Sequence, residues 1–481
     1  MNVHIIIYFL GCVLNIEALL MILPCLTALI YGEDTLYSFL AAMALCGSAG
    51  MAATFKKPRN SVFYAREGFV LVAMSWIALS FFGALPFWFS REIPSLTDAL
   101  FETVSGFTTT GASVVADVEG LSYSIIFWRS FTHWIGGMGV LVFILAILPM
   151  TGGGYNMHIM KAESPGPSVG KLVPKVRSTA KILYMIYLAM TLIQIGLLLA
   201  GGMPLFDSIT ISMGTAGTGG FGIKNNSIAF YDSYYLQSVI TVFMILFGIN
   251  FNVYYLFLVR KPKEALGCEE ARIYLGIIAV STLLITANVR SYFPSVFDAL
   301  HHAAFQVGSI ITTTGFSTVD FDLWPQFSKT ILLCLMFIGA CAGSTGGGMK
   351  VSRIIIWAKE SLKELLSLIH PRSVKVMKLE KKPIEHTVTR SANAFLIAYL
   401  MVFGLSVLIV SLDNYDFTTT FSAVAATFNN IGPGLGIVGP MSNFSALSGL
   451  SKYTLMFDML AGRLEIFPML LLFSPGTWRK Q

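Results

Sequence analysis

The stretch Thr108-Thr109-Thr110-Gly111 stands between a short amphipathic run and a long apolar run, and it recurs in altered form three more times. The later versions are Gly217-Thr218-Gly219-Gly220, Thr312-Thr313-Thr314-Gly315 and Asn429-Asn430-Ile431-Gly432. Small, polar turns that end in glycine contrast with a chain of which 55% is hydrophobic. Because all four occupy the same place in their segment of the chain, we hypothesise that they converge on one axis.

The composition is that of a membrane protein. Only 12% of the 481 residues are charged, about half the share in a typical soluble protein. Runs of roughly 20 apolar residues recur along the whole length, which indicates a polytopic helical membrane protein. We interpret the apolar run at 3–30 as a retained span and not a signal peptide, because it is long and contains Asn15, Glu17 and Pro24. No polar stretch is long enough for an enzymatic domain, so no catalytic residues are predicted.

Two spans, at 3–30 and 38–55, form an N-terminal extension over residues 1–55. After it, the order of span, half-length span, glycine turn and span repeats four times. The predicted fold is therefore all-α, with four tandem helix–pore helix–helix repeats in a pseudo-fourfold arrangement and two additional N-terminal transmembrane helices. The predicted repeats cover residues 68–150, 178–260, 270–370 and 390–474; the third has a broken second helix. In the other three, the second span is predicted at about 124–150, 234–259 and 453–473.

Each half-length span begins near an aspartate, and the interval from that aspartate to the turn glycine supports true repetition. The intervals are 13, 13, 17 and 16 residues, counted from Asp98 to Gly111, Asp207 to Gly220, Asp298 to Gly315 and Asp416 to Gly432. The two longer intervals predict that the later half-spans begin earlier or contain about one more turn of helix.

The distribution of charge sets the expected orientation. The linkers at 55–68, 152–181, 258–272, 349–390 and 475–481 hold 25 of the 32 Lys and Arg residues. If the half-spans re-enter, all five linkers lie on one side, which the positive-inside rule assigns to the cytoplasm. The opposite side then holds 14 acidic residues against six basic ones, and such a face would concentrate cations.

A half-span of about ten residues is about 15 Å of helix, half of the hydrocarbon thickness. It ends near the middle of the membrane with its carbonyl groups exposed. Non-helical backbone at that depth is tolerated only where protein buries it or where it lines a wet cavity. Four such turns can supply carbonyl oxygens that replace the hydration shell of a monovalent cation. The turns contain no carboxylate, which argues against a divalent-cation site.

Glycine-rich stretches also fit two roles unrelated to ion binding. Glycines can simply allow helices to pack closely, although four registered turns are harder to account for in this way. The stretch Gly343-Ser344-Thr345-Gly346-Gly347-Gly348-Met349-Lys350 superficially resembles a nucleotide-binding loop. In that motif the lysine directly follows the second glycine, whereas Met349 intervenes here and no strand pattern precedes it.

With these motifs the chain resembles the Trk/Ktr/HKT superfamily of potassium transporters, and its length and extra N-terminal spans are most similar to the TrkH branch. The resemblance implies a homodimeric, multi-pass protein of the bacterial inner membrane that takes up K⁺ as its transported ion, without a bound organic cofactor. It also implies a TrkA-like cytosolic nucleotide-binding regulatory partner, contact with membrane lipid and no binding of nucleic acid. In that superfamily one glycine of each turn is central to selectivity for potassium. The implied ion-binding residues are Thr109, Thr110, Gly111, Thr218, Gly219, Gly220, Thr313, Thr314, Gly315, Asn430, Ile431 and Gly432. The fourth turn departs most from the threonine pattern, which predicts a less symmetric filter.

The span after the third turn contains a candidate gate. Glycines at Gly343, Gly346, Gly347 and Gly348 disfavour a regular helix, and they lie about mid-membrane, below the proposed filter. A flexible loop there could obstruct the path, and the resemblance also implies an intramembrane gating loop. The alternative is a packing kink.

Arg463 lies in the last predicted span, where a charge is costly and normally faces a wet cavity or a partner. Below the filter it would repel cations, and the resemblance supports that role in the gate. The alternative is a structural ion pair with Asp458, Glu465 or another span.

Two further alternatives concern the inner segment and the mode of transport. The basic segment 350–390 contains a predicted amphipathic helix at 354–369, which would couple the gate to a cytosolic partner or contact anionic lipid. Instead of a channel-like protein, the chain could be a symporter that couples potassium to protons or sodium. A symporter normally requires an ionisable residue in the path, and Glu17 is a candidate only if it faces the pore.

Overall fold

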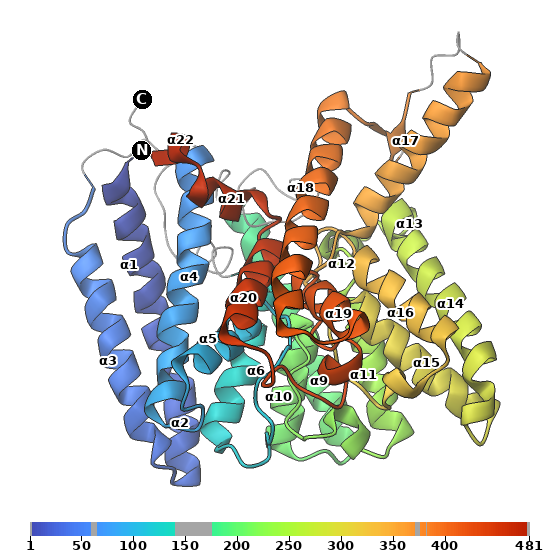
Figure 1. Ribbon diagram of the computed structural model, residues 1–481. Coiled ribbons are helices and arrows are strands. Elements are labelled where there is room, and N and C mark those ends of the chain that lie inside the picture. The colour runs from blue at the N-terminus through green and yellow to red at the C-terminus, as the bar shows by residue number, and fades with distance from the viewer. Residues whose placement is uncertain (1, 59–64, 140–175, 371–375, 381, 479–481) are drawn as a thin grey trace.

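The computed structural model describes residues 2–58, 65–139, 176–370, 376–380 and 382–478. These residues are mainly helical, and the strands among them form one two-stranded antiparallel hairpin (Figure 1). The α-helices are α1 Val3–Leu20, α2 Ile22–Tyr31, α3 Thr35–Thr54, α4 Ala65–Phe89, α5 Leu96–Phe107, α6 Tyr123–Gly137, α9 Val176–Ala200, α10 Leu205–Gly217, α11 Tyr234–Phe247, α12 Phe251–Leu258, α13 Pro262–Leu266, α14 Glu269–Val289, α15 Val296–Ile311, α16 Gln326–Ile338, α17 Val351–Ile369, α18 His386–Val410, α19 Phe417–Phe428, α20 Gly449–Arg463, α21 Phe467–Phe473 and α22 Pro475–Trp478. The strands are β1 Lys378–Leu379 and β2 Lys382–Pro383, and short 3₁₀ turns are η1 Ser227–Phe230, η2 Arg290–Tyr292, η3 Phe321–Leu323, η4 Ser411–Asp413 and η5 Gly436–Val438.

Six described helical stretches are long and apolar enough to cross a membrane. They are Val3–Tyr31, Thr35–Thr54, Arg66–Phe89, Ala180–Ala200, Glu269–Tyr292 and His386–Asp413. Their length and hydropathy confirm the prediction of an all-α polytopic membrane protein. The two N-terminal stretches lie at one edge of the bundle, shown in blue in Figure 1.

Four short helices precede the four glycine turns and agree closely with the predicted half-spans. They are α5, α10, α15 and α19, which end at Phe107, Gly217, Ile311 and Phe428. Helix α15 has 16 residues against 12 in α5, which explains its longer aspartate-to-glycine interval. In the fourth segment the helix is not longer; Asp416 is instead the N-cap and accepts a hydrogen bond from the Thr419 N–H at 3.1 Å.

Two spans that were predicted as continuous helices are broken. The stretch 234–259 is not one helix, because α11 and α12 meet at 91° across residues 248–250. The stretch 453–473 divides into α20 and α21, and Glu465 and Ile466 at the junction have positive φ angles of 58° and 67°. Arg463 is therefore the last residue of a helix and not the middle of a continuous span. The end of the predicted span at 124–150 lies outside the described residues beyond Gly139.

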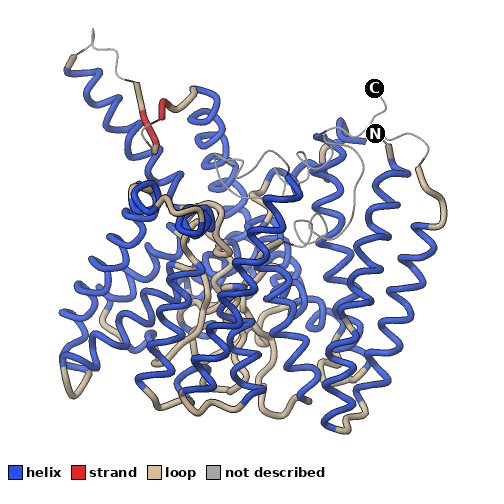
Figure 2. The backbone as a smooth tube through the Cα atoms, turned by 180° about the vertical axis from the view of Figure 1, so that it is seen from behind, coloured by secondary structure: helices blue, strands red, loops and turns tan. Residues whose placement is uncertain are grey.

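Two helices from the basic linkers lie at the same end of the molecule. Helix α22 and the projecting helix α17 are both at the upper end in Figure 1, which is the side that the positive-inside rule assigns to the cytoplasm. Seen from behind, loop segments run through the middle of the helical bundle (Figure 2). Backbone without helical hydrogen bonds thus lies at the centre of the fold, surrounded by protein, as the membrane environment requires.

Candidate ion path and gate

The four glycine turns contact one another in cyclic order. A Cβ atom built on the turn glycine would meet a backbone carbonyl oxygen of the next turn in every case. The distances are 2.0 Å from Gly111 to Gly219 O, 1.8 Å from Gly220 to Thr314 O, 2.2 Å from Gly315 to Ile431 O and 2.7 Å from Gly432 to Thr110 O. We call this closed arrangement, residues 108–111, 217–220, 312–315 and 429–432, the turn ring.

The backbone of the turn ring follows one local design. The residue two before each glycine has a positive φ of 53° to 59°, at Thr109, Thr218, Thr313 and Asn430. The next N–H group bonds back to the helix, with lengths of 2.8 to 2.9 Å at Thr110, Gly219, Thr314 and Ile431. This bond caps carbonyl groups that the helix end leaves free. The four glycines have φ between 75° and 99°, a region in which other residues are strained.

The side-chain hydrogen bonds that stabilise the turns differ from one turn to another. The hydroxyl groups of Thr108 and Thr110 bond at 2.8 Å, and those of Thr312 and Thr314 bond at 2.7 Å. In the fourth turn the Asn430 amide donates to the Thr110 hydroxyl at 3.0 Å. The asparagine that breaks the threonine pattern therefore connects the fourth turn to the first and closes the ring.

Glycines on the flanking helices allow this close packing, and sequence reasoning missed them. A Cβ on Gly136 of α6 would lie 1.8 Å from Phe107 O, and one on Gly462 of α20 would lie 2.0 Å from Phe428 O. Each glycine thus faces the end of the short helix in its own segment. Each lies 13 residues after the start of its helix, α6 at Tyr123 and α20 at Gly449, a match that only the observed helix starts reveal.

A cavity of about 110 Å³ lies beside the turn ring and is lined by all four ring glycines. Its remaining wall comes from the segments that follow the turns, including residues 112–116 and 438–444. The ring glycines therefore stand together at the floor of one opening.

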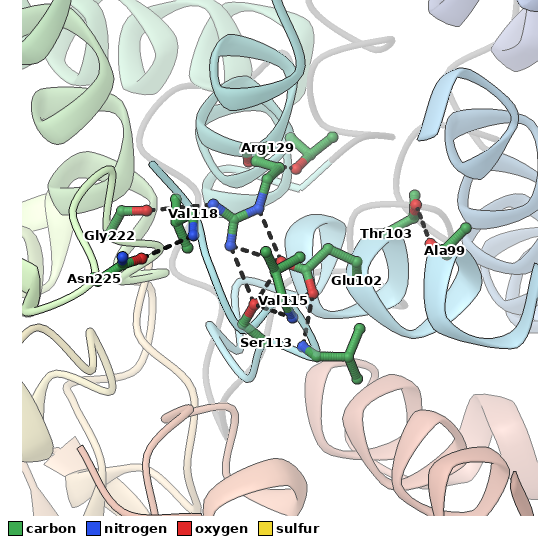
Figure 3. Close-up of polar contacts among 11 residues, drawn as sticks. Ala99, Glu102, Thr103, Ser113, Val115, Val118, Arg129, Gly222 and Asn225 are labelled. Atoms are coloured by element: carbon green, nitrogen blue, oxygen red, sulfur yellow. Dashed lines mark hydrogen bonds and ion pairs between the residues drawn. The ribbon is translucent and has the colours of Figure 1, made fainter. Parts of the chain in front are cut away.

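A buried ion pair joins two of the segments around this cavity (Figure 3). The Arg129 guanidinium bonds to the Glu102 carboxylate at 2.6 and 2.8 Å, and both side chains are almost completely buried. Glu102 also accepts from the Ser113 hydroxyl and the Val114 N–H, while Arg129 donates to Gly222 O at 3.3 Å. The charge count assigns both residues to the outer face, and the structure shows in addition that they hold together the segments after the first and second turns. The signal was an ionisable residue inside each apolar helix.

The loop at residues 339–350, which we call the gate loop, lies directly against the turn ring. The Gly347 N–H donates to the Thr313 hydroxyl at 2.6 Å. A Cβ on Gly346 would lie 2.9 Å from Thr312 O, and one on Gly347 would lie 2.6 Å from Asn429 O. The loop thus contacts the third and fourth turns.

The gate loop also fills the break between α11 and α12. Cys341 and Thr345 donate backbone N–H groups to Gly248 O at 3.0 Å and Phe247 O at 3.4 Å. In return the Phe251 N–H donates to Gly343 O at 3.0 Å. The gate loop therefore provides hydrogen-bond partners for the backbone groups that the break between α11 and α12 leaves free. This explains how a membrane span of the second repeat can be broken inside the bundle.

Arg463 connects the gate loop to the first segment. Its guanidinium donates to Thr345 O at 2.8 Å, Gly136 O at 2.6 Å and Gly137 O at 2.9 Å. The two acids considered as its partners have other contacts: Glu465 pairs with Arg353 at 2.6 Å, and Asp458 accepts from the Ser406 hydroxyl at 2.7 Å.

Other candidate sites lie away from this region. Glu17 contacts Cys46 of α3 and faces Gly83 of α4, and is not at the turn ring. Among the residues that the structure describes, no three His, Cys, Asp or Glu side chains are grouped to hold a metal ion.

Comparison with known proteins places this architecture in a family. The TrkH family profile, described as a cation transport protein, matches residues 36–290 and 279–479. The chain is 38% identical over 472 residues to the Trk system potassium uptake protein TrkH of Escherichia coli, with 96% of each chain covered, and 34% identical over 487 residues to TrkG of the same organism, with 99% covered.

A solved structure of a TrkH protein also matches the fold of this chain. The crystal structure of the potassium transporter TrkH from Vibrio parahaemolyticus matches with a TM-score of 0.89 and 34% identity, and all of both chains is covered. The family consists of transporters and not enzymes, and its Trk members are multi-pass proteins of the bacterial inner membrane. On its sequence and its structure together, this chain belongs to the TrkH family of cation transport proteins.

Proposed function

We propose that this chain is the potassium-conducting subunit of a bacterial Trk-type uptake system and that K⁺ passes through the turn ring. The cyclic contact of the four ring glycines with carbonyl groups of the next turn is the observation that carries this proposal. Backbone oxygens held at one level by a stiff frame can replace the water around a monovalent cation. The names of the TrkH and TrkG relatives, which are potassium uptake proteins, identify the ion.

The gate loop and Arg463 form the barrier in this proposal. The loop lies against the ring through Gly346 and Gly347, and the Arg463 guanidinium fixes it through Thr345 O. A positive charge at that point repels a cation that leaves the ring, since charges interact strongly away from bulk water. Opening would require the loop to leave Arg463.

Regulation from the cytoplasm belongs to the same proposal. Helix α17 follows the gate loop directly and projects from the bundle (Figure 1), with exposed apolar side chains at Leu362, Leu365 and Leu368. We propose that the protein works as a homodimer in the membrane and that a TrkA-like nucleotide-binding partner acts on this inner region. Anionic lipid is the competing ligand for its basic residues.

The proposal is tested by rubidium flux into proteoliposomes that contain the purified full chain, without a pH or sodium gradient. We expect uptake that follows the rubidium gradient alone and that potassium inhibits. Strict dependence on a proton or sodium gradient would instead support the symporter. The contacts of Glu17 with Cys46 and near Gly83, and not with the turn ring, support the channel-like alternative.

A further inference from the structure

One buried carboxylate holds both ends of the gate loop. The Oε1 atom of Glu270, in the first turn of α14, accepts from the Ala342 N–H at 2.7 Å and from the Ser352 N–H at 3.0 Å. Ala342 lies near the start of the loop, and Ser352 is the second residue of α17. Glu270 is only 6% exposed, so these hydrogen bonds are shielded from water and their loss would leave buried N–H groups without this acceptor.

The same turn of α14 is held from the cytoplasmic side by the β1–β2 hairpin. Glu380, in the turn of that hairpin, accepts from the Glu269 N–H at 2.9 Å and from the Glu270 N–H at 3.3 Å. A carboxylate at this position satisfies free N–H groups at the start of a helix and interacts favourably with the helix dipole. The hairpin therefore fixes the backbone of the residue whose side chain holds the loop.

A second contact connects the hairpin to α17. Lys359 of α17 donates to Lys378 O of the hairpin at 2.8 Å and pairs with the Glu269 carboxylate. Hairpin, α14 and α17 thus form one cluster at the cytoplasmic end of the gate loop. The hairpin and α17 lie in the inner segment 350–390 for which coupling was predicted, but sequence reasoning singled out neither Glu270 nor Glu380.

We propose that Glu270 is a positioning residue that keeps the gate loop closed, and that Glu380 transmits the position of the cytoplasmic hairpin to it. When a cytoplasmic partner displaces the hairpin, the first turn of α14 loses its cap and Glu270 releases Ala342 and Ser352. The loop can then leave the turn ring. This inference rests on the proposed function, because it assigns a mechanism to the gate of that path.

The buried lysine that ends the gate loop also contributes to this arrangement. Lys350 interacts electrostatically with Glu270 and donates from Nζ to Gly346 O of the loop. A negative charge at position 270 thus faces a positive charge at the end of the loop, in addition to the two N–H groups. Arg463, Arg353 and Glu465 are the other charged groups that act on Lys350.

The test compares variants of the full chain in proteoliposomes, by rubidium flux. Glu270→Ala should raise flux by roughly fivefold or more, because two charge-assisted hydrogen bonds are lost. Glu270→Gln retains an oxygen that can accept from both N–H groups but loses the charge that faces Lys350, so it should raise flux clearly less than Glu270→Ala does. Glu380→Ala should raise flux to an intermediate level. Glu385→Ala is the matched control, since Glu385 is exposed in the same segment and contacts Thr387.

A second measurement does not depend on transport. Cys341 is completely buried in the gate loop, and its rate of reaction with a thiol reagent reports release of the loop. With the other five cysteines replaced, Glu270→Ala and Glu380→Ala should accelerate labelling of Cys341, whereas Glu385→Ala should not.

The following results distinguish a failure of the proposal for Glu270 from a failure of the proposed function. Unchanged flux and labelling in folded Glu270→Ala and Glu380→Ala would overturn the role of Glu270, as would equal effects of Glu270→Ala and Glu270→Gln. If even the unmodified protein and Arg463→Ala carry no rubidium, the proposed function fails. The labelling experiment still decides whether Glu270 holds the loop.

Discussion

At the residue scale, the four ring glycines differ in how closely the neighbouring turn approaches. The carbonyl oxygen would lie 1.8 Å from a Cβ at Gly220 and 2.7 Å from one at Gly432. Positive φ adds about 1–3 kcal/mol of strain for any other residue. We expect Gly220→Ala and Gly111→Ala to lower rubidium uptake by at least about tenfold, equivalent to ~1.4 kcal/mol, and Gly432→Ala to lower it least.

The control for this series is Gly404→Ala, since nothing lies within 4 Å of a Cβ at that position in α18. Uptake by that variant should be unchanged. If the three ring variants lost uptake equally, or if Gly404→Ala also lost it, close approach of the turns would not be the cause.

Arg463 gives a second prediction at this scale. Arg463→Ala removes the charge and the contacts with Thr345 O, Gly136 O and Gly137 O, so flux should rise severalfold. Arg463→Lys keeps the charge but loses the planar guanidinium with its several donors. Its flux should lie between that of the unmodified protein and that of Arg463→Ala. Arg390→Ala, on the exposed inner end of α18, is the control. Unchanged or lower flux in a well-folded Arg463→Ala protein would contradict a role in the barrier.

The Arg129–Glu102 pair should matter for stability. Glu102→Ala leaves a buried guanidinium without its counter-charge, which costs about 3–5 kcal/mol. Thermal unfolding of the purified protein in detergent should show a clear loss of stability. Breaking the exposed Lys224–Glu119 pair with Glu119→Ala should hardly change the unfolding temperature. Equal effects of the two substitutions would show that the buried pair has no special part in holding the outer segments.

At the scale of elements, the gate loop and the α11–α12 break depend on each other. Each satisfies backbone groups that the other leaves free, at Gly248, Phe247 and Gly343. The gate loop also packs closely at Gly346: a Cβ there would lie 2.5 Å from the Ala340 Cβ within the loop and 2.9 Å from Thr312 O of the turn ring. Since Gly346 is not among the glycines with positive φ, replacing it tests contact without the added effect of backbone strain.

We therefore expect Gly346→Ala to push the loop away from the third turn and to raise rubidium flux. Gly196→Ala in α9, where a Cβ meets nothing within 4 Å, should leave flux unchanged. A fall in flux with Gly346→Ala would mean that the loop supports the ring instead of obstructing the path.

At the scale of the whole molecule, the predicted outer face has more acidic than basic residues. Four of its six cations pair with acids, at Arg129, Lys224, Lys329 and Lys452. Ten of the 14 carboxylates then remain to face Arg91 and Arg290. A field of this kind raises the local concentration of cations, and salt screens it over about 10 Å at 0.1 M. Adding an impermeant salt outside should weaken the apparent affinity for rubidium.

External acid should have little effect down to about pH 5, the range above the usual titration of carboxylates. Hydrogen bonds from Asn225 hold the pKa of Asp117 and of Glu119 below their ordinary values. Their stabilising contacts are therefore complete above the unfolded pKa and disappear only as pH falls through the lower folded one. A sharp loss of apparent affinity between pH 7 and pH 6 would point to a different titrating group.

The sequence was sufficient to predict the four short helices before the turns and the order of the spans around them. Hydropathy and the aspartate-to-glycine intervals predicted α5, α10, α15 and α19 to within a few residues, since these helices are defined by local periodicity and capping. Hydropathy gave no warning that 234–259 and 453–473 are each two helices. Those breaks are stabilised by distant partners, such as Gly343 O for the Phe251 N–H, and an apolar run has the same composition whether it is straight or bent.

By itself, the sequence determined that this is a polytopic membrane protein built on four glycine turns, because repetition and hydropathy are properties of the chain alone. Only the tertiary structure decided that each turn meets the next through a carbonyl group, that Asn430 closes the ring onto Thr110, and that Glu102 with Arg129 and Glu270 with the gate loop are pairs. The physical reason is that these contacts join residues far apart in the chain, such as Asn430 and Thr110, which are 320 positions apart. Their free energy depends on burial and geometry, which exist only once the helices have packed.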